Sequence, residues 1–442
     1  MTTEVIIRGG TIVTVDAEST VSKGDILCRD SRIVQVGGEA TPTANDFEIL
    51  DAEGCIVMPG LVQSHLHMCQ TLARGRADDL ALLDWLQTVV WPYEGALDEA
   101  DVACAARLAC AELLRGGTTA ILDMGTVHHT DQLFAVARDA GIRATIGKTM
   151  MDADDAGHPV GLQENAAWSL AESSRLCNEW HEQAGGRLRY AFAPRFALSC
   201  SDRLLRDTAL AARELGARIH THSSENSDEI DLVRRRRGAE NIVYLNDVGI
   251  TGADVGLAHC VWLSEQERDI LRTTQTHVLH CPSSNLKLAS GIAHVPELIA
   301  QGISVSLGAD GAPCNNNLDG FLEMRLAALI HRPRAGARAM PTSQVVRMAT
   351  LGGARALGLD HLIGSLEPNK LADIIVVDAM GAHVAPTENP YSALVYACRS
   401  TDVRHVVVDG VVRVRDRDLL TLDAAAVAAD ARERARRLFN RI

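Results

Sequence analysis

The sequence has no apolar run long enough to cross a membrane. No window of 18 or more residues is free of charged and polar side chains, whereas a membrane-spanning helix needs about 20 mostly apolar residues. The first ten residues, MTTEVIIRGG, also lack the basic and then apolar pattern of a secretory signal. We therefore expect a soluble, cytoplasmic protein without a membrane partner.

The sequence also has fewer basic than acidic residues and no closely spaced CxxC pair of cysteines. Lys and Arg number 43 against 57 Asp and Glu, and the formal net charge of −14 argues against a nucleic-acid partner. The one basic run, residues 234–237, lies in a helical-looking stretch and is interpreted as a solvated helix face. The eleven cysteines are dispersed and form no CxxC pair, so we expect reduced thiols.

Both ends of the chain have the alternating pattern of β-strands. Residues 1–57 contain EVIIRGGTIVTVD and DILCRDSRIVQVG, and residues 365–442 contain KLADIIVVDA and VRHVVVDGVVRVRD before an Ala/Arg/Glu-rich closing helix at 423–440. Because chain termini often lie close together, we expect these two segments to form one small composite β-sandwich domain.

The segment between them, residues 58–364, alternates short apolar runs with amphipathic helical stretches such as 99–115 and 202–215. Eight strands, each followed by a helix, predict an α/β fold, a (β/α)8 TIM-type barrel. A doubly wound open sheet would alternate too, but it usually has fewer strands and a glycine-rich first turn, which is absent here. The predicted strands are 59–66, 118–124, 143–149, 188–196, 217–223, 254–260, 276–282 and 303–310.

Histidine and aspartate gather at the predicted strand ends, where the chemistry of such barrels collects. His65 and His67 end the first strand, and they share one strand face because alternate residues of a strand point to the same side. His222, His259 and Asp310 end the fifth, sixth and eighth strands. Three imidazoles and a carboxylate suit a divalent ion such as Zn²⁺ or Fe²⁺.

Glu225 follows His222 by three residues and lies just beyond its strand. A carboxylate there could reach a metal-bound water and move a proton to a leaving group, although a first-turn glutamate is also common. His220 shares the strand face of His222 one layer deeper, and we interpret it as a core histidine of the barrel.

Five motifs in fixed order resemble those of the amidohydrolase superfamily. They are PGLVQSHLHM, HTHSSEN, LAHCVWL, HCPSSNLKLASG and SLGADGAPCNNNLD. They are most similar to the aminohydrolase branch, which contains methylthioadenosine/S-adenosylhomocysteine deaminases, guanine deaminases and triazine hydrolases. The resemblance covers essentially the whole chain and is much more specific for the branch than for a substrate.

The resemblance implies one divalent metal ion per chain, most often zinc with iron as the alternative, held by four residues: His65, His67, His222 and Asp310. The binuclear members have a bridging lysine at the end of the fourth strand, where this chain has Arg195. The ion would lower the pKa of its water, with His259 and Asp310 orienting that water and Glu225 transferring protons. The expected reaction is the hydrolytic release of ammonia from an amino-substituted nitrogen heterocycle.

Two signals for the substrate disagree. The stretch 74–94 is similar to adenosine-derivative deaminases, in which the acid corresponding to Glu94 would bind ribose hydroxyls, and Trp85 could wall the ring. Methylthioadenosine-type enzymes tend to have histidine where this chain has Arg195, whose guanidinium favours a ring carbonyl, as in guanine or isocytosine. Lys148, at the end of the third strand, could face the pocket or its rim.

Two other functions remain open at this point. The same metal site could remove chloride or an alkylamine from an s-triazine. A non-catalytic scaffold would be expected to have lost metal ligands, and here the set is complete. We also expect a homo-oligomer, a dimer or tetramer, by resemblance to large barrels of this kind.

Overall fold

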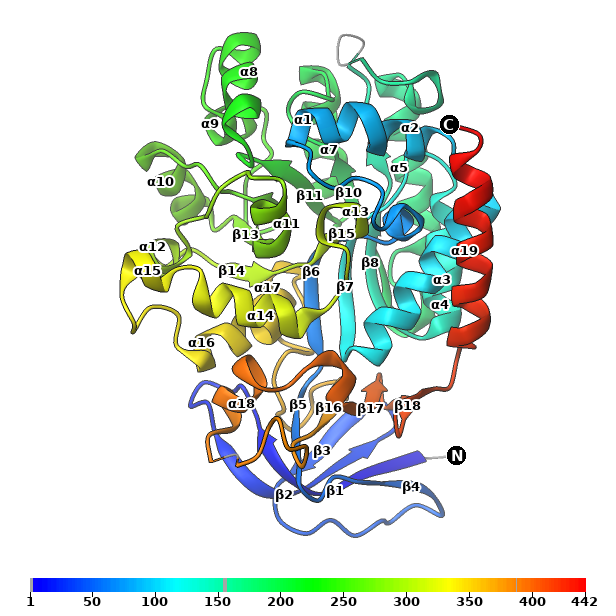
Figure 1. Cartoon of the computed structure of the whole chain (residues 1–442), viewed down its shortest axis with the longest axis vertical. Helices are drawn as coiled ribbons and strands as arrows, with labels where there is room; N and C mark the ends of the chain where they lie inside the picture. The colour runs from blue at the N-terminus through cyan, green and yellow to red at the C-terminus, as the bar shows by residue number, and fades with distance from the viewer. Residues whose placement is uncertain (1–2, 154–156, 387) are drawn as a thin grey trace.

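A computed structural model describes residues 3–153, 157–386 and 388–442 (Figure 1). It contains two sheets, one built from both ends of the chain and one from its middle. Within the described residues, no helix has the length and apolar character needed to cross a membrane. All eleven cysteines are buried, and none forms a disulfide.

The strands of the two termini form one nine-stranded sheet, at the bottom of Figure 1. Its order is β19-β18-β17-β16-β5-β1-β2-β3, with β4 paired to β1. The join between the two halves is the antiparallel pairing of β5 with β16, so the predicted association of the two termini is confirmed. The bounds are β1 Thr3–Val13, β2 Val21–Arg29, β3 Arg32–Val36, β4 Asp46–Asp51, β5 Cys55–Pro59, β16 Ile374–Asp378, β17 Val403–Val408, β18 Val411–Arg415 and β19 Asp418–Leu419.

The strands of the middle segment form a parallel sheet that closes on itself. Its order is β14-β13-β12-β11-β10-β8-β7-β6-β15, with β9 on β10. β14 and β15 are two pieces of the predicted eighth strand, and β15 pairs with β6, which closes the ring. The predicted α/β barrel is therefore confirmed. The bounds are β6 Leu61–His67, β7 Thr118–Met124, β8 Arg143–Gly147, β9 Thr149–Met150, β10 Leu188–Pro194, β11 Arg218–Ser223, β12 Val255–His259, β13 His277–His280, β14 Val305–Leu307 and β15 Asp310–Gly311.

Helices surround the barrel, and their ends carry recognisable caps. Asp98 and Asp101 form a capping box at the start of α3, and Gly238 ends α8 in the left-handed conformation. The α-helical bounds are α1 Leu82–Trp85, α2 Trp91–Gly95, α3 Glu99–Arg115, α4 Thr130–Ala140, α5 Ala166–Trp180, α6 Gln183–Gly186, α7 Asp202–Glu214, α8 Ser227–Arg237, α9 Asn241–Asp247, α10 Glu265–Thr274, α11 Pro282–Lys287, α12 Val295–Ala300, α13 Ala312–Asn315, α14 Gly320–Leu329, α15 Arg332–Ala335, α16 Thr342–Arg347, α17 Gly353–Ala356, α18 Pro390–Tyr396 and α19 Ala424–Phe439.

Short helical turns of other types complete the elements. Two π-helical turns, η2 Leu86–Val90 and η5 Met348–Gly352, continue α1 and α16. The 3-10 turns are η1 Met68–Ala73, η4 Val160–Leu162 and η6 Ser400–Asp402.

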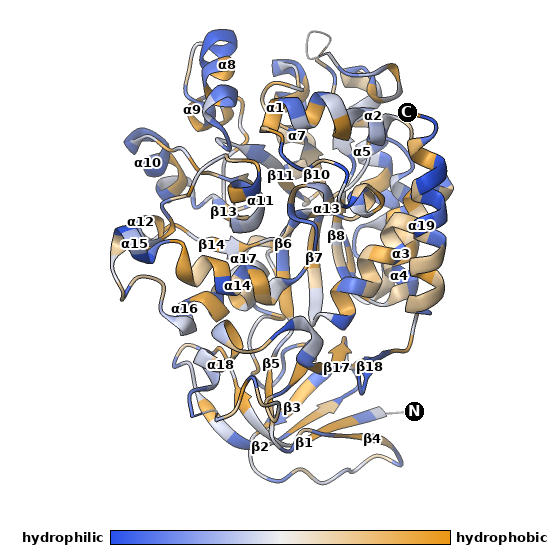
Figure 2. Ribbon diagram, in the orientation of Figure 1, coloured by the Kyte–Doolittle hydropathy of each residue, from blue (hydrophilic) through white to orange (hydrophobic). Residues whose placement is uncertain are grey.

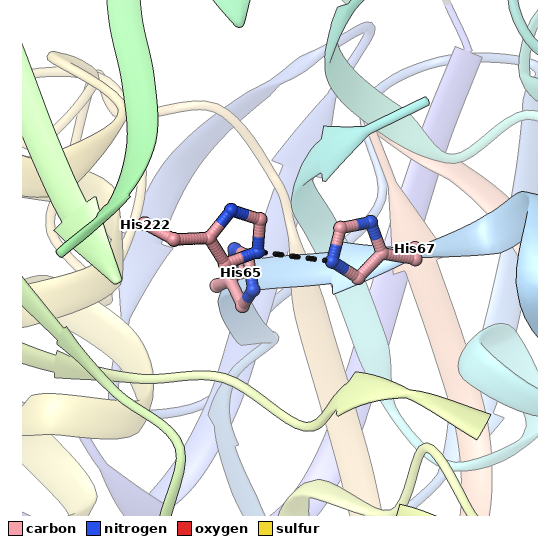
Figure 3. A group of neighbouring side chains, drawn as sticks. All are labelled: His65, His67 and His222. Carbon is pink, nitrogen blue, oxygen red and sulfur yellow. Dashed lines mark hydrogen bonds between the residues drawn. The ribbon is translucent and has the colours of Figure 1, made fainter. Parts of the chain in front are cut away.

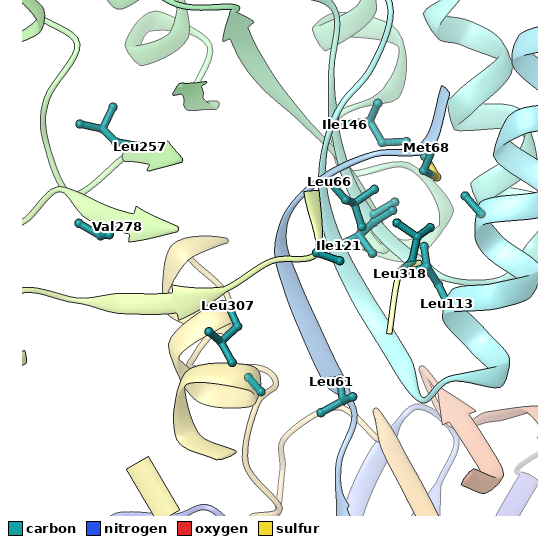
Figure 4. Packing of buried hydrophobic residues seen from close by; sticks show 14 of the residues in the cluster. Leu61, Leu66, Met68, Leu113, Ile121, Ile146, Leu257, Val278, Leu307 and Leu318 are labelled. Atoms are coloured by element: carbon teal, nitrogen blue, oxygen red, sulfur yellow. The ribbon is translucent and has the colours of Figure 1, made fainter. Parts of the chain in front are cut away.

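Successive residues of the barrel strands belong to two different apolar cores. Ile121, Leu257 and Val278 face the surrounding helices, where Leu113 of α3 also lies (Figure 4). Their neighbours Leu122 and Leu279 belong instead to a separate cluster with residues of α17 and the following loop. This alternation follows from the two-residue period of a strand. In Figure 2 the barrel strands and the surrounding helices both have mixed hydropathy colours.

The terminal sheet and the barrel are held together by buried charge and by the last helix. Arg143 of β8 donates to Asp373 at 2.7 and 3.0 Å, and both side chains are almost fully buried. Helix α19 packs along α3 on the outside of the barrel (Figure 1). The segment bounds 57/58 and 364/365 stay a prediction.

Candidate active site

Three predicted metal ligands converge at the carboxyl ends of β6 and β11. His65 and His67 extend from β6 and His222 from β11, and their nearest ring nitrogens lie within 4.8 Å of one another (Figure 3). His67 Nε2 and His222 Nε2 are 3.3 Å apart. Asp310 completes the group, because its Oδ1 lies 3.3 Å from His65 Nε2 and 3.4 Å from His67 Nε2.

The outer nitrogen of each imidazole is already held, which leaves Nε2 directed at the centre. His67 Nδ1 is hydrogen-bonded to the Met124 carbonyl oxygen at 2.8 Å, and His222 Nδ1 to the Arg195 carbonyl oxygen at 2.7 Å. His65 Nδ1 lies 2.7 Å from His220 Nε2, so the histidine interpreted as core supports a predicted ligand. Metal-binding histidines are typically oriented in this way through their second nitrogen.

The electrostatics of the cluster also fit a cation. Burial, followed by the neighbouring His65, lowers the pKa of His67 to about 4, and burial lowers the pKa of His222 as well. Neutral imidazoles present a lone pair, which is the form that a metal ion requires. His65 Nε2 is fully buried without a hydrogen-bond partner. A divalent ion among these four residues would satisfy this nitrogen.

Glu225 and His259 lie beside this cluster. Glu225 Oε2 is 3.5 Å from His259 Nε2, and the same nitrogen is 3.9 Å from Asp310 Oδ2. Burial raises the pKa of Glu225 to about 7, with Asp310 and Glu229 adding to the effect and His259 opposing it. The structure thus gathers all six residues predicted for metal binding and proton transfer: His65, His67, His222, Glu225, His259 and Asp310.

Left-handed backbone turns two of these side chains toward the centre. His259 has φ +73° and Asp310 φ +62°, values that residues other than glycine rarely adopt. Leu257 faces the helices and Ala258 the barrel interior, so strand alternation alone would point His259 outward. The sequence carries no signal for this reversal.

A small, largely apolar pocket opens beside the cluster. About 450 Å³ of space in and around it is not filled by protein atoms, part of it open to solvent. Trp85 lines it, as predicted from the stretch 74–94. Its other walls are His67, Leu82, Leu86, Arg195, Phe196, His222, Glu225, Glu229, His259, Leu288 and Asp310.

Arg195 and Glu94, which the sequence associates with different substrates, form one buried ion pair. Arg195 Nη1 donates to Glu94 Oε2 at 2.5 Å and Nη2 donates to Oε1 at 3.3 Å. Gln70 Nε2 donates to the same carboxylate at 2.8 Å. The Arg195 backbone carbonyl also accepts the hydrogen bond of His222. The pair therefore connects the pocket wall to a predicted metal ligand.

Lys148 is not brought into the pocket lining. Its ammonium is fully buried and donates to Glu164 Oε2 at 2.6 Å, and it lies 5.2 Å from the centre of the Trp168 ring. The break between β8 and β9 falls at this residue. Its side chain is thus directed into the loop and helix that follow β9, where it contacts Glu164 and Ser169 and not the residues that line the pocket.

Three residues that the sequence analysis left without a role contact the predicted catalytic groups. Ser284, Asn285 and Ser290 are hydrogen-bonded to Asp310, His259 and Glu225 in turn. All three lie in the motif HCPSSNLKLASG. That motif carried the resemblance, but nothing in its residue types indicated contact with other strands.

Most of the chain matches one known protein family. The model of the Amidohydrolase family matches residues 56–413, which include both the site and the pairing partners of β16. The chain belongs to the amidohydrolase family. The membership predicted from the five motifs is confirmed.

Similar amidohydrolases with assigned names cover nearly the full length. A 5′-deoxyadenosine deaminase of Methanosarcina mazei is 36% identical over 441 residues, 99% of each chain. A 5-methylthioadenosine/S-adenosylhomocysteine deaminase of Syntrophobacter fumaroxidans is 40% identical over 441 residues, 98% of each chain.

Solved amidohydrolase structures share the fold. An adenosine deaminase from Xanthomonas campestris with bound zinc has a TM-score of 0.91 and 32% identity, and covers 99% of this chain and 98% of its own. The atrazine chlorohydrolase of Arthrobacter aurescens, complexed with zinc, has a TM-score of 0.92 at 25% identity, with 98% and 100% covered. The guanine deaminase of E. coli has a TM-score of 0.84 at 27% identity, with 94% and 100% covered.

Proposed function

We propose that this chain is a zinc-dependent deaminase that releases ammonia from an adenosine derivative modified at the 5′ position. The prediction of a hydrolytic deaminase is confirmed at the level of reaction class by the full-length relatives. The adenosine derivative is favoured because those relatives are named for 5′-deoxyadenosine, methylthioadenosine and S-adenosylhomocysteine. The proposal rests mainly on one observation. Four residues of the types that bind metal ions lie together with Glu225 and His259 beside one pocket.

His65, His67, His222 and Asp310 would hold one ion. The donor set of three imidazoles and a carboxylate suits zinc, and similar structures contain zinc. When bound, such an ion lowers the pKa of a water molecule toward neutrality and so supplies a nucleophile.

Glu225 moves protons, and its burial favours the protonated form that can donate one. It gives a proton to the ring nitrogen next to the carbon that bears the amino group, while the oxygen of water adds to that carbon. Glu225 then takes one proton from the added water oxygen and gives it to the amino group, the C–N bond breaks, and ammonia leaves. The remaining hydroxyl proton returns to Glu225 as the ring carbonyl forms, so Glu225 ends the cycle protonated. His259 and Asp310 orient the water through Nε2 and the carboxylate.

The substrate is bound by the pocket wall and the ion pair behind it. Trp85, Leu86 and Phe196 offer apolar surface to a flat ring. Glu94 keeps acceptor capacity toward hydroxyl groups, since a carboxylate has about four lone-pair sites and three donated bonds are present. We infer that the pair Glu94–Arg195 binds the sugar edge as one unit.

An amino-oxo base such as guanine is the second candidate. It is favoured by Arg195 in the pocket lining, because a guanidinium can donate to a ring carbonyl through a donor that Glu94 leaves free. The triazine hydrolase alternative has less support, since relatives with 36–40% identity that cover more than 90% of the chain are named as deaminases.

Ammonia release by zinc-reconstituted protein tests the proposal. The panel is 5′-deoxyadenosine, methylthioadenosine, S-adenosylhomocysteine, adenosine, guanine, isocytosine, a pterin and melamine, and a chlorotriazine is assayed in parallel for chloride release. We expect the 5′-modified adenosines to have the highest kcat/KM. Activity confined to the oxo-bearing bases would replace the first candidate by the second, and release of chloride from a chlorotriazine without deamination would overturn both.

A further inference from the structure

The proposed mechanism does not involve Ser283–Ser290, the segment that follows the seventh barrel strand. It begins in α11, directly after β13, and it contains the central residues of the motif HCPSSNLKLASG. Three of its side chains nevertheless point at the site, and all three are at most 2% exposed: Ser284, Asn285 and Ser290.

Each of these side chains contacts a different catalytic group, on or just after a different strand. Ser284 Oγ donates to Asp310 Oδ2 at 2.5 Å. Asn285 Oδ1 accepts from His259 Nδ1 at 2.9 Å. Ser290 Oγ donates to Glu225 Oε1 at 3.2 Å.

In each case the segment binds one atom of the catalytic group, while a second atom of that group lies nearer to other residues of the site. Asp310 Oδ1 also accepts the Gly311 backbone N–H at 2.7 Å. Asp310 Oδ1, rather than the Oδ2 that Ser284 binds, faces His65 and His67. His259 Nε2, rather than the Nδ1 bound by Asn285, faces Glu225. The hydrogen bonds from the segment thus determine which atom of each catalytic group is directed at the place where a ligand, a water or a proton would bind.

The segment is itself anchored at both ends. Ser283 donates to the buried carboxylate of Glu323 through its backbone N–H at 3.2 Å and its hydroxyl at 2.5 Å. At the other end, Trp262 Nε1 donates to the Ser290 carbonyl at 2.7 Å. The Ser290 N–H also donates to the Asn285 carbonyl at 2.8 Å, which folds the segment back on itself. A rigid support of this kind can orient what it touches.

We propose that the segment Ser283–Ser290 is the positioning element of the site, and that Ser284, Asn285 and Ser290 set the orientations of Asp310, His259 and Glu225. The proposal rests on the proposed function for its catalytic part. Its metal-binding part, the action of Ser284 through Asp310, is independent of the substrate.

Zinc affinity tests Ser284 without any substrate. Competition with a chelating dye would compare the wild type with Ser284→Ala and, as a second variant that lacks the hydroxyl and adds no metal ligand, Ser284→Gly. We expect both to bind zinc about 10- to 100-fold more weakly, the range for loss of a residue that orients a metal ligand. The matched control is Ser365→Ala, because Ser365 is also a buried serine that donates to a carboxylate, that of Glu367, in the terminal region. Unchanged zinc affinity in both Ser284 variants would overturn the proposal.

Steady-state deamination of 5′-deoxyadenosine tests Asn285. Asn285→Leu removes the acceptor of His259, whereas Asn285→Asp keeps an oxygen at the same place. We expect kcat to fall at least 10-fold in Asn285→Leu, with KM within about twofold, and to recover substantially in Asn285→Asp. A structural role alone would lower the thermal midpoint without this difference in kcat between the two variants. Equal kcat losses in both would contradict the proposal.

A double-mutant comparison tests Ser290 in single-turnover reactions. Ser290→Ala is expected to slow the wild type about 10-fold, but to have little further effect in the Glu225→Gln background, because Ser290 acts through Glu225. Equal losses in the two backgrounds would overturn that role. If wild-type protein with bound zinc does not deaminate 5′-deoxyadenosine, the proposed function fails, and the zinc measurement still decides the role of Ser284.

Discussion

At the scale of single residues, the site is built from groups that weaken the folded state. His259 and Asp310 have left-handed backbone, which costs on the order of 1–3 kcal/mol for each residue. Five imidazoles share one buried space, those of His65, His67, His220, His222 and His259. Such arrangements persist when the surrounding structure and a ligand hold them in place, and they are typical of functional sites.

Glu225→Gln should separate catalysis from folding. The amide has the size of the carboxyl but cannot transfer a proton, so we expect a folded, zinc-loaded protein whose kcat falls about 10²- to 10⁴-fold. Ammonia release and zinc content of one preparation measure both properties. The control is Glu265→Gln, an exposed first-turn glutamate of α10. Wild-type turnover in Glu225→Gln would remove this residue from proton transfer.

Asp123 is expected to make stability depend on pH. Burial raises its pKa from 3.8 to about 7, while the Met68 N–H bond lowers it, and Oδ2 has no hydrogen-bond partner. The folded state therefore holds the proton more tightly than the unfolded state, so the contribution of Asp123 falls as pH rises from about 4 to 7.

Asp123→Asn removes this ionisable group. We expect it to raise the free energy of unfolding by about 2–4 kcal/mol at pH 8, and the gain should shrink to nearly zero at pH 4.5. Urea unfolding of both proteins at each pH measures the difference. The exposed Asp139→Asn serves as the control. A gain that is independent of pH would contradict the assignment.

The predicted metal ligands could be recognised from the sequence, but the residues that support them could not. His65, His67, His222 and Asp310 are recognisable because parallel strands deliver their ends to one edge. The Glu94–Arg195 pair was not foreseen, since the residues are 101 positions apart and each had a plausible partner in a substrate. The contacts of Ser284, Asn285 and Ser290 depend on the fold of a loop, for which residue types give little information.

At the scale of elements, the strand ends are where sequence and structure differ most. The predicted strand 143–149 breaks at Lys148, and the predicted strand 303–310 divides into β14 and β15. Both breaks change the direction of side chains, and the hydrophobic pattern of the sequence does not record such a change. In contrast, α3 and α19 match their predicted ranges closely, because caps and long amphipathic patterns mark their ends.

A substitution of Lys148 would test whether its ion pair with Glu164 holds the loop and α5 to β8 and β9. Lys148→Met leaves the buried Glu164 carboxylate without its cation, although the Met151 N–H and the Ser169 hydroxyl still donate to it. We expect a loss of about 3–5 kcal/mol in the free energy of unfolding. KM for the substrate should not change. The double variant Lys148→Met/Glu164→Gln should recover part of the loss. A raised KM with unchanged stability would restore the substrate-binding role predicted from the sequence.

At the scale of the whole molecule, the metal ion is expected to act as a stabilising ligand. A ligand that binds only the folded state adds stability in proportion to the logarithm of its concentration over Kd, about 4 kcal/mol at 1,000 times Kd. We therefore expect a chelator to lower the thermal midpoint by several degrees and added zinc to restore it. His65→Asn should respond to neither, and an equal response in this variant would place the ion elsewhere.

The overall architecture was the most predictable level. A count of eight strand–helix repeats and two β-rich termini was sufficient, because a parallel barrel needs each strand to be followed by a helix. The closure through β15 and the single sheet shared by both termini depend on long-range pairings that no local pattern records.

The pairing of β5 with β16 also has a consequence for biosynthesis. Roughly 300 residues separate these strands, and at about 5–20 residues per second a ribosome takes about 15 to 60 s to make them. During that interval the edge of β5 is without its neighbour, while the barrel can already form. The nascent chain therefore exposes unpaired backbone N–H and C=O groups along β5, and these are covered only when the C-terminal segment has been made. We expect chains that stop before β16 to aggregate or be degraded.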